Sequence, residues 1–98
     1  MEQSINIKTT ITLNNGVKMP IFGLGTYQSQ SNEVGEACMS AYKFGYIHID
    51  TATFYENEKV IGLAMKEMKR DEIFLVTKLW NSDHHKVEKA LEESLAKL

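Results

Sequence analysis

The stretch HIDTATFYENE, residues 48–58, carries most of the information in this chain. It begins at the end of an apolar run over 46–50, which predicts a buried strand, and it ends where helical spacing begins over 57–68. A second stretch, TKLW at 77–80, lies at the end of a strand predicted over 73–78. Strands that alternate with helices predict a parallel sheet with helices packed against it.

Turn and capping residues mark the other elements. Asn15 and Gly16 supply the positive φ values of a type I′ turn, which predicts a hairpin. Ser31 or Asn32 can cap a helix, and Gly45 stands where a helix C-cap glycine belongs. The predicted elements are hairpin strands at 9–13 and 17–19, buried strands at 21–26, 46–50 and 73–78, and a helix after each buried strand, the second over 57–68 and the third from Asp83. The third helix has a predicted buried stripe of Val87, Ala90, Leu91, Ser94, Leu95 and Leu98.

Composition excludes several classes of protein. The 98 residues are 43% hydrophobic and 24% charged, with a net charge of −2, as in ordinary soluble globular proteins. There is no basic run that would predict nucleic-acid binding, and no apolar segment that would predict a membrane span or a signal peptide. We therefore expect a cytoplasmic protein without nucleic-acid or membrane partners, and we leave its oligomeric state open.

The cysteine and the histidines are expected to be structural. Cys38, the only cysteine, falls on the apolar face of the first predicted helix and is expected to be an inert core residue. His48 shares a strand face with Asp50, one layer below it, and is expected to be a satisfied interior histidine. Adjacent residues on a helix point in different directions, so His84 and His85 do not predict a metal site.

Three side chains are placed for proton transfer at the carboxyl ends of neighbouring strands. Asp50 and Lys78 are each the last residue of a predicted strand. Parallel strands lie about 4.8 Å apart, so we expect the two side chains to form an ion pair. Tyr55 lies in the loop that opens the next helix and can fold back over that pair. The carboxyl ends of parallel strands are where α/β folds place catalysis.

These residue types suit the reduction of a carbonyl group. A free tyrosine has a pKa near 10, and an ammonium within hydrogen-bond reach favours the phenolate and lowers that pKa. Asp50 would keep the Lys78 ammonium charged. Tyr55 would then act as general acid to a carbonyl oxygen while a hydride arrives at carbon. A buried ion pair beside a core tyrosine is the alternative, because such pairs also occur without catalysis.

The segment GLGTYQ, residues 23–28, begins like a dinucleotide fingerprint but lacks its third glycine, so a Rossmann interpretation fails. Gly25 and Thr26 could let a flat ring approach the end of the first buried strand, or could form only a tight strand end. Tyr27 and Trp80 are candidate walls of a pocket.

Together these motifs resemble the aldo-keto reductase family. The opening LNNGVKMP (13–20) resembles the family's first hairpin. The segments GLGT (23–26), GYIHIDTA (45–52), YENE (55–58) and TKLWNS (77–82) are similar to its successive signatures, in order and spacing. The resemblance implies an α/β fold, the (β/α)8 TIM barrel closed at the bottom by the hairpin. Residues 1–98 would form the N-terminal part of this single domain, with the hairpin and about three βα units.

The resemblance also implies NADPH-dependent reduction of aldehydes and ketones, with a small carbonyl compound as substrate. Carried over by motif, Asp50, Tyr55 and Lys78 match three members of the family's catalytic tetrad, with Tyr55 as the proton donor.

The same carry-over assigns the cofactor and substrate positions. Gly25, Thr26 and Asp50 match positions beside the nicotinamide and its ribose. Tyr27 and Trp80 match walls of the substrate pocket.

The chain also departs from the family's pattern. Tyr27 stands where tryptophan is more frequent, and Ile47 replaces a frequent arginine. The fourth tetrad member, a histidine, would lie past Leu98. A complete barrel takes about 250 residues, so we expect an inactive fragment of a longer enzyme. Two alternatives remain: a non-catalytic barrel that serves as a binding or regulatory subunit, and an aldolase that uses Lys78 as a Schiff-base nucleophile.

Overall fold

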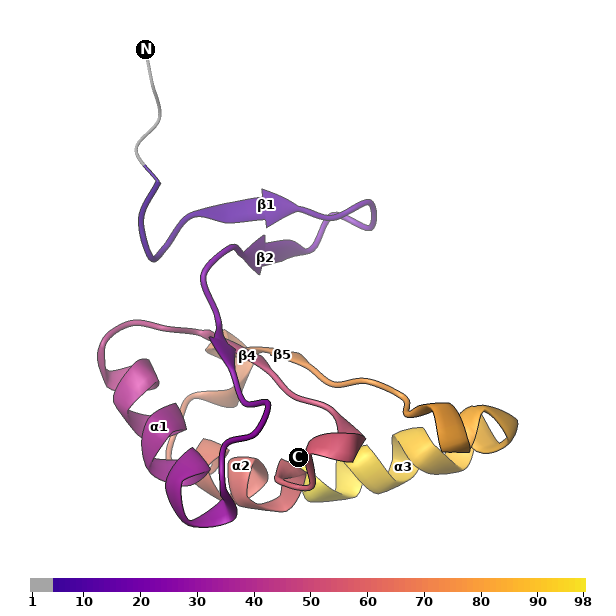
Figure 1. The fold of residues 1–98 in the computed structure, drawn as a ribbon. Helices are drawn as coiled ribbons and strands as arrows, with labels where there is room; N and C mark the ends of the chain where they lie inside the picture. Colours follow the sequence, from indigo (N-terminus) through magenta and orange to yellow (C-terminus); the bar gives the residue numbers. More distant parts are fainter. Residues whose placement is uncertain (1–4) are drawn as a thin grey trace.

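A computed structural model describes residues 5–98, so the first four residues of the domain predicted over 1–98 lie outside the described part. It confirms the predicted order of a hairpin followed by three strand–helix units (Figure 1). The strands are β1 (Thr10–Thr12), β2 (Lys18–Pro20), β3 (Leu24–Gly25), β4 (His48–Asp50) and β5 (Phe74–Val76). The helices are α1 (Ser31–Lys43), α2 (Glu58–Met65) and α3 (Val87–Lys97), with short 3-10 turns η1 (Thr53–Tyr55), η2 (Arg70–Glu72) and η3 (Asn81–Lys86).

The hairpin of β1 and β2 closes through a three-residue loop. The Leu13 N–H donates to Val17 O at 2.8 Å, and the Gly16 N–H donates to Leu13 O at 2.9 Å. Gly16 has a φ of +86°, whereas Asn15 stays at negative φ and accepts the Val17 N–H with its side-chain oxygen at 3.1 Å. A type I′ turn needs two residues at positive φ, so that prediction was wrong. The loop instead is of the three-residue kind that ends in a left-handed glycine.

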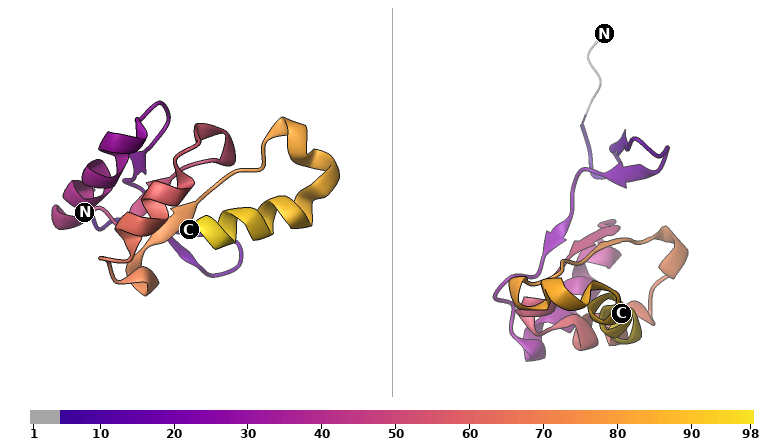
Figure 2. Two further views of the ribbon diagram at one scale, coloured as in Figure 1. Left: turned by 90° about the horizontal axis from the view of Figure 1, so that it is seen from below. Right: turned by 90° about the vertical axis from the view of Figure 1, so that its right-hand side faces the viewer.

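β3, β4 and β5 form a parallel sheet in that order. Leu24, Ile49 and Leu75 are paired across it and belong to the core on the side of the helices. Because side chains alternate along a strand, the next row, Gly25 with Asp50, faces the opposite side. Figure 2 shows α1, α2 and α3 as one layer against the sheet, so the face that bears Asp50 is left open.

The strands are shorter than predicted. Ile21, Phe22 and Gly23 lie outside β3 and are exposed, the first two by 39% and 41%, so the buried strand predicted over 21–26 was wrong for its first three residues. The reason is that the Ile21 N–H donates to Thr9 O at 3.0 Å, which extends the hairpin instead. β5 ends at Val76, so Lys78 is not the last residue of its strand, as was predicted, but lies beyond it.

The core lies between the sheet and the helical layer. Val34 and Cys38 of α1 meet Ile49 of β4 and Ile61 and Met65 of α2, all of them buried. Burial raises the pKa of the Cys38 thiol, which keeps it protonated and unreactive. The structure thus confirms that Cys38 is a core residue.

The helix boundaries differ from the predicted ones in two places. α1 begins after Gln30, with no side-chain hydrogen bond to cap it, so the predicted caps at Ser31 or Asn32 were wrong. Asp83 does not open α3, because it lies within η3, where its carboxylate pairs with Lys86 Nζ at 3.4 Å.

α3 is the least covered helix. Ala90 and Ser94 are buried, whereas Val87, Leu91 and Leu95 are more than half exposed. Only part of the predicted stripe is therefore buried, because α3 lies at the edge of the helical layer with α2 on one side (Figure 2). None of the helices in residues 5–98 is both long and apolar enough to cross a membrane.

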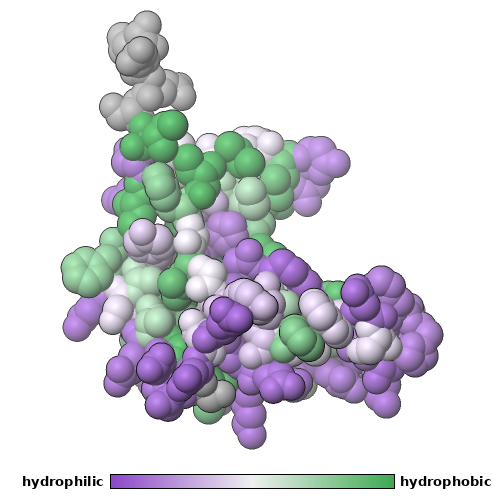
Figure 3. Space-filling model, in the orientation of Figure 1, coloured by the Kyte–Doolittle hydropathy of each residue, from purple (hydrophilic) through white to green (hydrophobic). Residues whose placement is uncertain are grey.

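Large apolar side chains are also exposed around the hairpin. Figure 3 shows hydrophobic residues gathered over that part of the molecule and hydrophilic ones over the helical layer. The exposed residues there are Ile5, Ile11, Val17, Ile21 and Phe22. Grouped apolar surface of this kind is typical of a contact surface.

Candidate active site

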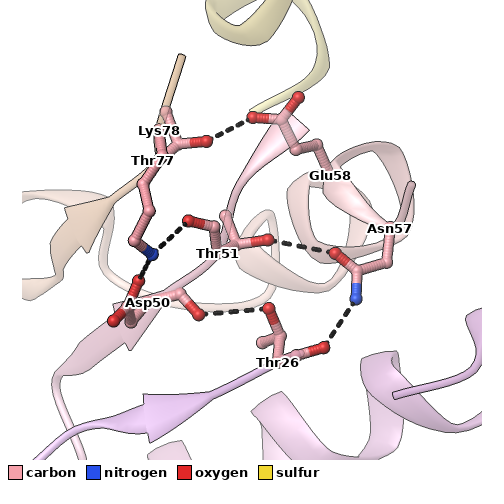
Figure 4. Close-up of polar contacts among 7 residues, drawn as sticks. All are labelled: Thr26, Asp50, Thr51, Asn57, Glu58, Thr77 and Lys78. Carbon is pink, nitrogen blue, oxygen red and sulfur yellow. Dashed lines mark hydrogen bonds and ion pairs between the residues drawn. The ribbon is translucent and has the colours of Figure 1, made fainter. Parts of the chain in front are cut away.

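The structure contains the predicted ion pair at the carboxyl end of the sheet. Lys78 Nζ donates to Asp50 Oδ1 and also to Thr51 O, the latter at 3.0 Å (Figure 4). The same nitrogen lies 5.3 Å from the centre of the Tyr55 ring. Three contacts from β4 and the turn after it therefore hold Lys78, although its own strand has already ended.

The ion pair keeps Lys78 charged. Partial burial on its own lowers the pKa of Lys78, but the hydrogen bond and the charge of Asp50, together with Tyr55, outweigh it and raise the pKa above its ordinary value. The Lys78 and Asp50 side chains are 44% and 46% exposed, so water reaches both. The site is therefore open on the side that faces away from the helices.

Two pairs of aromatic rings involve the turn that carries Tyr55. The ring centres of Tyr27 and Tyr55 are 5.1 Å apart, and Tyr27 is 61% exposed. Trp80 stacks face to face on Phe54, with ring centres 4.0 Å apart and planes inclined by 9°. Sequence reasoning missed Phe54, although it directly precedes Tyr55 and so belongs to the same turn.

Gly25 and Thr26 differ in what they offer. A Cβ added at Gly25 would meet nothing within 4 Å, so the space beside this backbone is open. Thr26 is only 1% exposed, and its hydroxyl donates to Asp50 O at 3.1 Å. A flat ring can therefore approach Gly25, while the Thr26 side chain is committed to holding β3 against β4.

His48 is partly buried, and one of its two ring nitrogens has a partner, so the structure confirms the predicted structural role only in part. Its Nδ1 lies 2.8 Å from Pro20 O, and its ring meets the Phe74 ring edge to face at 5.2 Å. A Cβ at Gly23 would lie 2.9 Å from His48 Cγ, so a glycine there lets the chain pass this ring. Across residues 5–98, no three His, Cys, Asp or Glu side chains are grouped in a way that could hold a metal ion.

Sequence reasoning also missed Asn57, which organises one half of the site. This residue is 1% exposed. Its Nδ2 donates to Thr26 O at 3.0 Å and to Ser29 O at 3.4 Å, and its Oδ1 accepts the Thr51 hydroxyl at 3.0 Å (Figure 4). Asn57 therefore ties the chain after β3 to the chain after β4.

Glu58, the next residue, was missed in the same way and is 2% exposed. Its Oε2 accepts the Thr77 hydroxyl at 2.6 Å, and its Oε1 accepts the Ser94 hydroxyl at 3.2 Å. Polar residues at the start of a helix are usually solvated, and the sequence therefore offered little reason to expect these two to be buried. The one available signal was that Asn57 and Glu58 stand next to Tyr55 in the segment YENE (55–58).

Comparisons with known proteins agree on one family. The model of the aldo/keto reductase family matches residues 21–98. Glycerol 2-dehydrogenase (NADP(+)) of Saccharomyces cerevisiae is 48% identical over 90 residues, which cover 90% of this chain and 29% of the yeast protein. Methylglyoxal reductase DkgA of Escherichia coli is 46% identical over 92 residues, which cover 92% of this chain and 34% of that protein.

Solved structures are similar over the same region. An aldo/keto reductase from Brucella melitensis superposes with a TM-score of 0.87 at 41% identity, covering 98% of this chain and 38% of that one. The Bombyx mori aldo-keto reductase in complex with NADP gives 0.86 at 39% identity, covering 92% and 34%. The chain thus spans about a third of the length of these relatives. Aldo-keto reductases are (β/α)8 barrels and the match is to their N-terminal region, which confirms the predicted fold class.

Proposed function

Because this chain belongs to the aldo/keto reductase family, we propose that it supplies Tyr55, Lys78 and Asp50 to the site of an NADP(H)-dependent reductase of aldehydes and ketones. The observation that carries the proposal is the charged Lys78, held between Asp50 and Thr51 O beside the Tyr55 ring. The strands and residues that would complete such a barrel are not among these 98 residues.

Each of the three residues has a separate part in the proposed reaction. Tyr55 donates its phenolic proton to the carbonyl oxygen as general acid. Lys78 stabilises the phenolate that remains, because an ammonium favours the charged form of a neighbouring acid. Asp50 keeps Lys78 charged and fixed in direction. NADPH, when bound, supplies the hydride that reaches the carbonyl carbon.

The open backbone at the end of β3 fits the flat ring of a nicotinamide. Gly25 and Asp50 are paired in register, so the accessible backbone and the half-exposed carboxylate lie side by side. Both residues would hold the nicotinamide end of NADPH. Thr26 would contribute by fixing the strand end, because its hydroxyl is already bonded to Asp50 O.

Tyr27 and Trp80 would form walls of the substrate pocket. The relatives' names concern short carbonyl and polyol compounds, among them a methylglyoxal reductase and a D/L-glyceraldehyde reductase. Glyceraldehyde and methylglyoxal are therefore suitable probes for a first assay.

The raised pKa of Lys78 weighs against the alternative of a Schiff-base aldolase. A lysine nucleophile must be neutral to attack a carbonyl, and active lysines of this kind have lowered pKa values. In this chain the partners of Lys78 raise its pKa instead. A non-catalytic barrel is distinguished from a reductase by the following experiment.

The test uses a protein in which these 98 residues are joined to the strands that complete the barrel, called the intact protein below, and compares it with its Tyr55→Phe variant. The wild type should oxidise NADPH in the presence of glyceraldehyde or methylglyoxal, and loss of the general acid should lower kcat by about 10²-fold or more. NADPH binding, followed by quenching of protein fluorescence, should be retained. Tyr46→Phe, a tyrosine outside the site, is the matched control. Wild-type protein that binds NADPH but reduces neither compound, or a Tyr55→Phe variant with full activity, would contradict the proposal.

A further inference from the structure

We propose that Glu58 is a positioning residue for Lys78: through Thr77 it holds the chain after β5 in the conformation that directs the ammonium toward Asp50. This inference rests on the proposed reductase function, whose site it extends to a residue behind the sheet.

Glu58 is buried, with only 2% of its surface exposed. Burying a carboxylate is costly unless hydrogen bonds satisfy it. Each of its oxygens accepts a hydroxyl hydrogen bond, from Thr77 and from Ser94, and it stands at the first position of α2, where a helix favours negative charge. A carboxylate that only opened the helix could remain in water. The burial therefore indicates that the hydrogen bonds from Thr77 and Ser94 to this carboxylate have a structural role.

Thr77 is the first residue after β5. Thr77 and Lys78 follow the end of β5 at Val76, so the regular strand pairing no longer holds them. The backbone bond from the Thr53 N–H to Lys78 O is long, at 3.4 Å, whereas the bond from Thr77 to Glu58 is short, at 2.6 Å. The side-chain bond to Glu58 is therefore the stronger restraint on this segment.

The side chains of Thr77 and Lys78 point in different directions. Neighbouring side chains in an extended segment point to opposite sides. Figure 4 shows Thr77 directed toward Glu58 and Lys78 directed toward Asp50. A restraint on Thr77 behind the sheet thus fixes the backbone rotation that brings Lys78 to the front. Glu58 acts on Lys78 without touching it.

The same carboxylate is connected to the turn that carries Tyr55. The Ser94 hydroxyl that donates to Glu58 lies 3.2 Å from the hydroxyl of Thr53, the first residue of η1. η1 ends at Tyr55. Glu58 is therefore placed behind both the proposed proton donor and its cationic neighbour.

The test uses Glu58→Gln and Thr77→Val in the intact protein, with Glu92→Gln as a control on the exposed side of α3. Thr77→Val keeps the shape of the side chain and replaces only its hydroxyl by a methyl group, so this variant still tests the proposal if Glu58→Gln fails to fold. Thr77→Ser, which retains the hydroxyl, should behave like the wild type.

Two readouts separate positioning from mere stability. In folded Glu58→Gln and Thr77→Val, kcat should fall about tenfold or more while the NADPH affinity stays within about twofold, because small displacements of a reacting group are costly. The pKa of Lys78, followed by NMR of its side chain, should fall toward the ordinary value as the ammonium leaves Asp50. The double variant should be no worse than Glu58→Gln alone, since the bond that Thr77→Val removes is one of the two that Glu58 accepts.

The outcomes are distinguishable from those of the proposed function. Folded variants with an unchanged Lys78 titration and an unchanged kcat would overturn the role of Glu58, even if their melting temperatures fall. A wild type that reduces no carbonyl compound would overturn the reductase proposal. In that case the Lys78 titration alone would still decide whether Glu58 positions it.

Discussion

Removing the Asn57 side chain should destabilise the protein far more than removing any exposed asparagine. Asn57 is 1% exposed and its amide is used fully, as donor to two backbone oxygens and as acceptor from Thr51. In Asn57→Ala, the Thr51 hydroxyl loses its partner inside the molecule, and Thr26 O loses one of two hydrogen bonds, since it still accepts the Ser29 N–H at 3.1 Å. The contact to Ser29 O is long, at 3.4 Å, so its loss adds little.

The size of the effect follows from one group left unpaired and one further hydrogen bond lost. A buried polar group without a partner costs about 1–3 kcal/mol and a lost hydrogen bond about 0.5–1.5 kcal/mol, so together they predict a loss of about 1.5–4.5 kcal/mol in the free energy of unfolding. Water that enters the vacated space would bring the loss toward the lower end. Asn32→Ala, on the exposed side of α1, should change stability by less than about 0.5 kcal/mol.

The assay is urea unfolding of the intact protein and both variants, followed by circular dichroism and fitted with a common m value. NADPH binding should be measured on the same samples, because Asn57 fixes Thr26 and the loop that carries Tyr27. A loss of less than about 1 kcal/mol for Asn57→Ala, equal to that of Asn32→Ala, would refute the account of a buried hydrogen-bonded amide.

Two further results are expected. Asp50→Asn should cost no more than about 1 kcal/mol at neutral pH, because the ion pair is half exposed. Since the folded pKa of Lys78 is raised, the pair stabilises the fold below the unfolded pKa of about 10.4 and loses its effect as the pH rises through the folded value. Thermal unfolding of the wild type and Asp50→Asn should therefore converge at high pH, and a constant difference would contradict the assignment. Gly62→Ala should destabilise by about 1–3 kcal/mol, because its Cβ would lie 1.8 Å from Lys97 O. Gly35→Ala, where the nearest atom is a methyl at 3.4 Å, should instead be neutral or stabilise by up to about 1 kcal/mol, and equal melting temperatures for these two variants would refute the comparison.

The sequence predicted those parts of the structure that depend on local periodicity. The order of elements, the C-cap position of Gly45 with its φ of +99° and the burial of Cys38 all follow from spacing along one helix or strand. The meeting of Asp50 and Lys78 was predictable because adjacent parallel strands bring their carboxyl ends together.

What the sequence did not reveal depends on partners distant in the chain. The burial of Glu58 requires a hydroxyl from Ser94, 36 positions away, and Asn57 requires Thr26 O, 31 positions away. Local patterns contain no information about such contacts. The exposure of Leu91 and Leu95 has the same origin, because a helix stripe shows that a face is apolar but not which neighbours cover it.

The hydrogen bond between Ser94 and Glu58 has a consequence for how variants of this protein should be sought. Ser94 belongs to a helix on the outer side of the sheet, yet only Glu58 and Thr77 separate it from the residue that carries the ammonium. A mutant library restricted to the residues that surround the open face would leave Ser94 out. Random mutagenesis across the outer helices would include it, and it would sample changes in turnover that need no new contact with the substrate.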